Sequence, residues 1–210
     1  MRIRIAGLML GAIMATAGNA HAQVAWEAPL FASPQPARGF GVYVADMAGG
    51  DVGVMATWQA TRAPNRLELR FGIADNGRPA IADDSDISGF AGLNISGLLA
   101  RASADMPLDV SWVAGAGVGF GSWAIITLPV GVSAGHTFQA DGFDLTPYVT
   151  PRLVFDATMG LEDPFGGDAD QTDLGFVMDL GVDVALNRGW LLRFGASVGD
   201  HEALAFGIVF

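Results

Sequence analysis

The chain has 210 residues, of which 51% are hydrophobic, with a mean hydropathy of +0.38 and a formal net charge of −11. The excess of acids argues against a nucleic-acid partner, because phosphate binding requires a basic face. The chain contains no cysteine, which excludes a disulfide scaffold and a zinc–thiolate site. Beyond the N-terminus there is no run of about 20 apolar residues that would form a transmembrane helix. The high hydropathy therefore has another origin.

Residues 1–22 have the pattern of a signal peptide. Arg2 and Arg4 make the start positive, an apolar segment follows, and Ala20-His21-Ala22 is an A-x-A cleavage site. We expect this segment to be removed during export, so that Gln23 begins the mature chain. A single membrane anchor is the weaker alternative, because the segment is short and ends in small residues.

Residues 23–38 form a proline-containing N-terminal extension. Pro29, Pro34 and Pro36 deny it regular secondary structure. We interpret it as a short leader ahead of the first strand. A docked plug or lid is the alternative, but no feature of the sequence supports it.

From residue 39 to residue 210, apolar and polar side chains alternate with the period of two that is typical of β-strands. Between Leu174 and Leu186 every second residue is apolar, while the other parity carries Asp179 and Asp183. The pattern predicts ten strands, at 39–46, 52–61, 66–74, 87–101, 108–120, 124–138, 143–157, 172–186, 190–198 and 204–210.

The residues of the polar parity indicate which face is outside. They are mostly Gly, Ala and Ser with isolated Arg and Asp, whereas a solvated face carries many long charged side chains. Small residues and a few opposite charges suit the crowded interior of a narrow barrel. We therefore expect an all-β fold over residues 39–210: a closed antiparallel up-and-down transmembrane β-barrel. It has ten strands, or eight if the weak first hairpin around 48–50 does not join.

Aromatic residues gather near the predicted strand ends, where the rings of membrane barrels lie among lipid headgroups. The two longest connections, near 75–86 and 158–171, leave the same side. Outer-membrane barrels have their long loops on one side and short periplasmic turns on the other. We therefore expect an outer-membrane location with both termini periplasmic. The expected interfacial aromatics are Trp58, Trp112, Trp190, Phe138 and Phe143.

Over residues 39–210 the chain resembles the small bacterial outer-membrane β-barrel proteins of the OmpA-like and opacity-protein type. The resemblance is carried by the signal peptide, the alternation and the terminus ALAFGIVF. It implies that the barrel-assembly machinery reads the last strand as an assembly signal, but it implies no particular activity. The residues of this signal are Leu204, Phe206, Ile208 and Phe210.

Opposite charges on the inward parity are expected to fill the lumen. A three-residue connection at 187–189 would place Asp183 opposite Arg193, whereas a two-residue connection would mix the two faces. The two side chains would then form a charge-assisted pair. The whole expected lumen charge network is Asp183, Arg193, Asp179, Asp156, Arg152, Arg70 and Glu68.

Two histidines are candidates for chemistry. His136 shares its parity with outward residues near a turn, so we interpret it as an interfacial ring. His201 follows Gly199 and Asp200 in a tight turn, which we interpret as solvated. No Ser-His-acid order supports a catalytic site. We therefore expect no enzyme activity and no cofactor.

Two acidic clusters are candidates for cation binding. Their density of carboxylates suits Ca²⁺ or Mg²⁺, but their spacing does not match the EF-hand loop. We interpret them as hydrated surface loops, with bound divalent cations as the alternative. The first cluster is Asp83, Asp84 and Asp86, and the second is Glu162, Asp163, Asp168, Asp170 and Asp173.

The sequence leaves three functions open. We expect an integral outer-membrane protein in contact with lipid, with a structural or surface-interaction role and a lumen filled by side chains. A narrow pore or small-solute-binding barrel is the first alternative, and a lipid-modifying enzyme of the outer membrane is the second. The lumen charges favour the structural role, because a ten-strand barrel is close to the size at which side chains fill the interior.

Overall fold

The computed structural model describes residues 28–35, 39–47, 51–62, 64–76, 86–120, 124–159, 171–186 and 189–210. In this part of the chain no helix is long and apolar enough to span a membrane. The strands are β1 (Gly39–Met47), β2 (Asp51–Arg62), β3 (Asn65–Asn76), β4 (Asp86–Ala100), β5 (Asp109–Phe120), β6 (Ala124–Gly135), β7 (Phe138–Ala140), β8 (Phe143–Met159), β9 (Gln171–Leu186), β10 (Leu191–Gly199) and β11 (Ala203–Val209).

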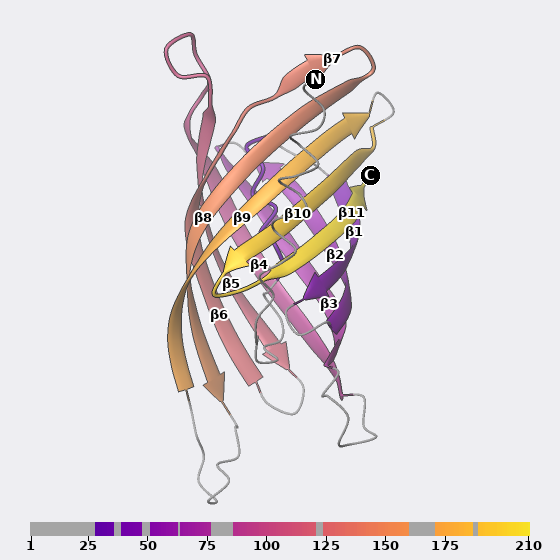
Figure 1. Ribbon diagram of the computed structural model, residues 1–210, viewed down its shortest axis with the longest axis vertical. Helices are drawn as coiled ribbons and strands as arrows, with labels where there is room; N and C mark the ends of the chain where they lie inside the picture. Colours follow the sequence, from indigo (N-terminus) through magenta and orange to yellow (C-terminus); the bar gives the residue numbers. More distant parts are fainter. Residues whose placement is uncertain are drawn as a thin grey trace, which may run out of the picture.

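Ten of these strands close into one antiparallel barrel (Figure 1). Among these ten strands, each pairs with the next along the chain, with β6 pairing directly to β8, and β1 pairs with β11. This confirms the predicted up-and-down barrel of ten strands. The eight-strand alternative is wrong, because β1 pairs with β2 along the whole length of β1 as part of the barrel. We call the end at which β11 finishes the C-terminal end, and the other the distal end.

Two local departures from the predicted strands have identifiable causes. The predicted strand 124–138 is interrupted at His136 and Thr137, and β7 continues beyond them. The His136 main-chain N–H donates to the Pro147 carbonyl, but proline has no N–H to return the bond. On β4, Leu98 pairs with Ser111 and Ala100 with Val110, so Leu99 forms a β-bulge.

The polar parity faces inward and the apolar parity outward. On β9, Asp179 and Asp183 are 1% and 2% exposed, whereas Leu174 is 65% exposed. Every barrel strand contributes large apolar side chains to the outer face. Examples, in strand order, are Val42, Val54, Phe71, Leu93, Val118, Leu128, Leu153, Phe176, Phe194 and Phe206.

Two tyrosines lie across the interior over glycines of a neighbouring strand. Tyr43 on β1 directly opposes Gly207 on β11, and Tyr148 on β8 opposes Gly181 on β9. A Cβ atom would come within 2.0 Å of the Tyr43 ring at Gly207 and within 2.1 Å of the Tyr148 ring at Gly181. The absence of a side chain at these glycines therefore lets each ring lie flat against the wall.

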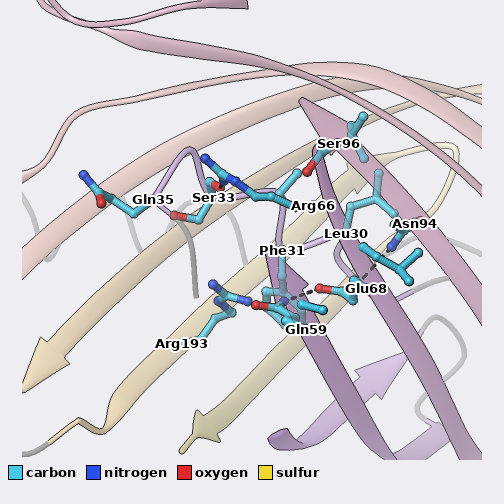
Figure 2. Close-up of a pocket in the computed structure, with 14 residues that line it drawn as sticks. Leu30, Phe31, Ser33, Gln35, Gln59, Arg66, Glu68, Asn94, Ser96 and Arg193 are labelled. Carbon is cyan, nitrogen blue, oxygen red and sulfur yellow. Dashed lines mark hydrogen bonds between the residues drawn. The ribbon is translucent and has the colours of Figure 1, made fainter. Parts of the chain in front are cut away.

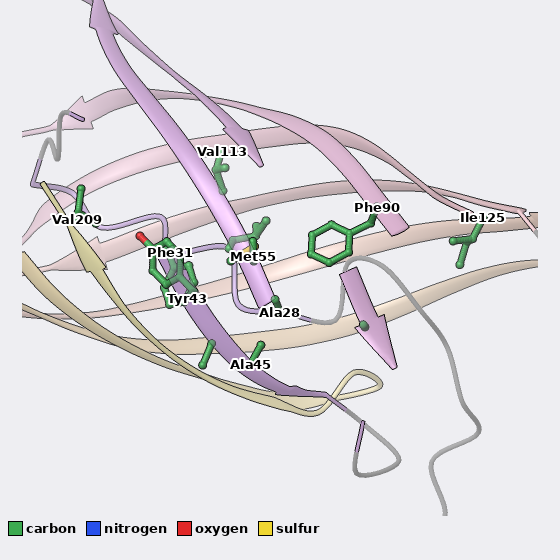
Figure 3. Packing of buried hydrophobic residues seen from close by; sticks show 12 residues of the cluster. Ala28, Phe31, Tyr43, Ala45, Met55, Phe90, Val113, Ile125 and Val209 are labelled. Carbon is green, nitrogen blue, oxygen red and sulfur yellow. The ribbon is translucent and has the colours of Figure 1, made fainter. Parts of the chain in front are cut away.

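The apolar part of the interior combines wall residues with residues 28–35 (Figure 3). Met55 and Phe90 project inward from β2 and β4, and Phe31 of the N-terminal segment lies against Tyr43. Ala28 and Leu30 are each 1% exposed and Phe31 is 3% exposed. The interpretation of this stretch as a leader ahead of the barrel is wrong for residues 28–35. They form a plug, which we call the internal segment.

Candidate functional site

The lumen is the candidate site, because charged side chains and the internal segment meet there. Asp183 on β9 and Arg193 on β10 are directly opposed. Arg193 donates from Nε to Asp183 Oδ1 at 2.8 Å and from Nη2 to Oδ2 at 2.7 Å, which makes a bidentate pair. Gly189, in the connection between the strands, has a φ of +79°, a left-handed conformation that glycine adopts without strain. The observed register is the one that parity predicts.

A second ion pair lies next to the first. Arg152 on β8 donates from Nε to Asp179 Oδ2 at 2.9 Å and from Nη2 to Oδ1 at 3.3 Å. Ser197 on β10 donates its hydroxyl to Asp179 Oδ1 at 2.7 Å. Asp179 therefore holds β8, β9 and β10 together on the lumen side.

A third ion pair lies on β3. Arg70 Nε donates to Glu68 Oε1 at 3.1 Å, and Asn94 on β4 donates its amide to the same oxygen at 3.1 Å. The Gln59 side chain on β2 donates to Glu68 Oε2. Glu68 is 8% exposed and Arg70 is 1% exposed. This carboxylate thus joins three adjacent strands.

The fourth acidic group is Asp156 on β8. It accepts a hydrogen bond from the Thr127 hydroxyl and lies 3.1 Å from His201 Nε2. His201 is 7% exposed, so its interpretation as a solvated turn residue is wrong. The turn between β10 and β11 brings the ring onto a carboxylate from a distant part of the sequence. In the described ranges no group of three histidine or acidic side chains is arranged to hold a metal ion.

All seven residues expected in the lumen network are buried on the inner face. They form three separate arginine–carboxylate pairs and the Asp156 cluster. The internal segment connects two of these pairs across the lumen. The Leu30 N–H donates to Asp179 Oδ2 at 3.3 Å, and the Leu30 carbonyl accepts from Arg70 Nη2 at 2.8 Å.

Arginines of β3 bind the main chain of the internal segment at two places; Figure 2 shows one of them, Arg66, beside Ser33. Arg70 also donates to the Pro29 carbonyl at 3.2 Å. Arg66 donates from Nη1 to the Ser33 carbonyl at 2.8 Å and from Nη2 to the Pro34 carbonyl. These bonds satisfy carbonyls that would otherwise be buried without partners, which is costly.

Phe31 is the aromatic anchor of the internal segment. Its ring stacks on Tyr43 with centroids 4.8 Å apart, and the Arg193 guanidinium carbon lies 5.6 Å from its centroid, within cation–π range. A Cβ at Gly195 would lie 2.6 Å from the Phe31 ring. The φ of Phe31 is +51°, uncommon for a bulky residue, so its surroundings hold it there.

A cavity of about 40 Å³ lies between the internal segment and the wall. Asn94 and Arg193 line it, and Asn94 Oδ1 and Arg193 Nη1 have no hydrogen-bond partner among the described residues. A water molecule needs about 10–15 Å³ of such volume and a few polar partners. The cavity thus has room for a few water molecules beside the segment. Other residues that line it include Ser33, Gln35, Gln59, Arg66 and Glu68.

The residues predicted for other roles lie outside the lumen. The expected interfacial aromatics are at the C-terminal end, and four of them are 40–53% exposed: Trp58, Trp190, Phe138 and Phe143; Trp112 is half-buried. His136 packs edge-on against Phe138 with ring centroids 4.7 Å apart. Leu204, Phe206, Ile208 and Phe210 alternate outward on β11 and just after it. In the acidic clusters, Asp83, Asp84, Glu162, Asp163, Asp168, Asp170 and the Asp86 side chain lie outside what the structure describes.

Alternation along the strands could not identify Leu30 or Phe31 as parts of the site. The internal segment has no period, and its main-chain carbonyls make the contacts. The prolines predicted that this stretch lacks regular secondary structure, but they did not indicate that it enters the lumen. No model of a known protein family matches the chain, and no curated protein is significantly similar to it.

Proposed function

We propose that this chain is an integral protein of a bacterial outer membrane, with a lumen closed from within and a structural or surface-interaction role. The observation that carries the proposal is the inverted distribution of side chains. Arg152 and Arg193 are each 1% exposed, whereas Phe71 and Phe206 are 49% and 42% exposed. A water-soluble barrel would bury its aromatic residues and expose its arginines.

The closed barrel supports this proposal, because closure satisfies the main-chain hydrogen bonds that hydrocarbon cannot. A tilted transmembrane strand needs about 9–11 residues. Nine of the ten barrel strands have 9 residues or more, and β11 has 7. These lengths suit a hydrocarbon layer.

The orientation follows from the connections. The chain enters β1 and leaves β11 at the C-terminal end, while the longest connections, 77–85 and 160–170, leave the distal end. Because outer-membrane barrels keep their short turns in the periplasm, we assign the C-terminal end to the periplasm. Trp58 and Trp190 would then lie at the inner interface. The acidic connections would lie outside, where divalent cations and surface partners have access.

The contacts in the lumen support a structural role and not a catalytic one. Each buried arginine of the three ion pairs is matched by a carboxylate, and the internal segment occupies the space between the walls. The cavity of about 40 Å³ beside Asn94 and Arg193 is far smaller than the roughly 300–1,000 Å³ of ordinary ligand pockets. The barrel thus has a filled lumen, which suits a structural role in which it holds its outer connections in place.

Membrane fractionation of cells producing the full chain tests the location. We expect the protein in the dense outer-membrane fraction, with faster electrophoretic migration before boiling than after. Recovery in the soluble periplasmic fraction would contradict the proposal. Planar-bilayer recording of the purified protein then tests closure, and we expect no steady conductance. A stable conductance step would favour the narrow-pore alternative.

A further inference from the structure

We propose that the lumen is a binding site for a short, uncharged peptide segment with an aromatic anchor, and that residues 29–34 occupy it as a ligand in cis. The inference goes beyond the proposed function, because it treats the internal segment as a ligand that can leave the barrel wall. It rests on the geometry of the lumen alone and does not depend on where the protein resides.

The wall balances its buried charges without the internal segment. The pairs Asp183–Arg193, Asp179–Arg152 and Glu68–Arg70 each join one wall residue to another. Residues 28–35 read APLFASPQ and contain no ionisable side chain. Removing one partner of a buried ion pair is costly because the other charge is left unpaired. Removing the internal segment takes away neither partner of these three pairs, so this cost does not arise.

The wall recognises the main chain of the segment. Arg70 binds the carbonyls of Pro29 and Leu30, and Arg66 binds those of Ser33 and Pro34. Asp179 accepts the Leu30 N–H. Donors to carbonyls and acceptors for N–H groups bind the main chain of a peptide independently of most of its side chains, as in other peptide-binding sites. The prolines lower the ordering cost because their φ is already fixed.

One position of the site selects a side chain. Phe31 stacks on Tyr43 and lies under Arg193, and Gly195 leaves the space that the ring and Pro29 fill. An aromatic residue at this place gains stacking and cation–π contacts that a small residue lacks. The preferred ligand therefore has an aromatic residue between a proline on one side and small or polar residues on the other.

The direct test is binding in trans. A full-length variant with Leu30→Asp and Phe31→Asp places two carboxylates in a lumen whose three ion pairs are already complete, so its own segment should leave the lumen. The probe is a synthetic peptide of residues 28–35, labelled with a fluorophore after Gln35, which is exposed at the C-terminal end. Fluorescence anisotropy in detergent micelles then measures binding to the folded barrel, whose fold is checked by heat-modifiable migration.

We expect saturable binding of this peptide to the variant and at least about tenfold weaker binding of a peptide carrying Phe31→Ala, which corresponds to the loss of one anchor. Wild-type protein should bind far less peptide, because its own segment competes at a high effective concentration. Adding Gly195→Leu to the variant should abolish binding, whereas Ala196→Leu, next to it but outward, should not. In a second variant Gly and Ser replace residues 28–35, and it should bind the peptide in the same way.

Four outcomes would overturn the proposal. One is no binding to either folded variant. Another is equal binding to the wild-type protein and to the variants, or binding that Gly195→Leu leaves unchanged. The last is failure of both variants to fold, which would make the segment an inseparable part of the core. None of these outcomes bears on membrane location, so they are distinct from a failure of the fractionation experiment.

Discussion

Asp183 and Arg193 face each other across β9 and β10 and share two hydrogen bonds of 2.7 and 2.8 Å on the inner face of the barrel. The same guanidinium lies beside the Phe31 ring. One ion pair therefore fixes the register of two strands and also forms part of the contact surface for the internal segment.

Arg193→Gln should destabilise the folded barrel by about 3–5 kcal/mol, because it leaves the Asp183 carboxylate buried without its counter-charge. Adding Asp183→Asn should restore most of that loss. The measurement is urea unfolding of the purified protein in lipid vesicles, with the exposed Arg101→Gln as a neutral control. Equal losses in the single and double variants would show that the pairing itself is unimportant.

The outward face gives a second prediction. Leu180 on β9 points outward, next to Asp179, which points into the lumen. Leu180→Arg should destabilise the barrel by about 2–4 kcal/mol if it lies at the bilayer midplane. The matched control is Ala185→Arg, on the inward parity near the C-terminal end, which should be much milder. Vesicle unfolding of the two variants checks this. A larger loss at Ala185 would contradict the assignment of the two faces.

Tyr148 gives a third prediction. Its ring lies on Gly181, and its buried hydroxyl has no hydrogen-bond partner among the described residues. Tyr148→Phe should therefore leave the free energy of unfolding within about 1 kcal/mol of wild type. Tyr148→Ala should cost about 3–5 kcal/mol, because it leaves a cavity over the glycine. The same unfolding measurement separates the two, and a large effect of Tyr148→Phe would reveal an unrecognised polar contact.

The wall of the barrel was predictable because its determinants are local. A period of two fixes which side chains face inward, and the parity around the 187–190 connection was enough to place Asp183 opposite Arg193. The positive φ of Gly189 follows from the same turn. Parity cannot predict which side chains meet across the lumen when they come from strands that are not neighbours.

The internal segment and His201 show this limit. Leu30 and its neighbours bind through main-chain atoms, which are the same in every sequence, so no residue type indicates the contacts. His201 was expected in water because its turn is short. It is instead buried, and its ring lies 3.1 Å from Asp156, which comes from a distant part of the sequence. Both features depend on barrel closure and have no local sequence pattern.

Phe210 gives the last prediction. Phe210 and Phe40 exchange two main-chain hydrogen bonds of 2.9 Å, which continue the β1–β11 pairing. The Phe210 side chain is 55% exposed and lies near the rings of Phe40 and Trp190. Phe210→Ala keeps the main-chain bonds and removes only the ring, whereas deletion of Phe210 removes both. The two variants thus separate barrel closure from recognition of the aromatic terminus.

If the assembly machinery reads this ring, Phe210→Ala should slow the appearance of the heat-modifiable form in cells, measured by pulse-chase labelling. The same variant refolded in vesicles should lose only about 1 kcal/mol or less, because an exposed ring contributes little. Phe194→Ala removes a similarly exposed ring from β10 and should assemble at the normal rate. Deletion of Phe210 should impair both assembly and stability, since it also removes the hydrogen bonds to Phe40. Normal assembly of Phe210→Ala would show that the aromatic terminus is not the signal.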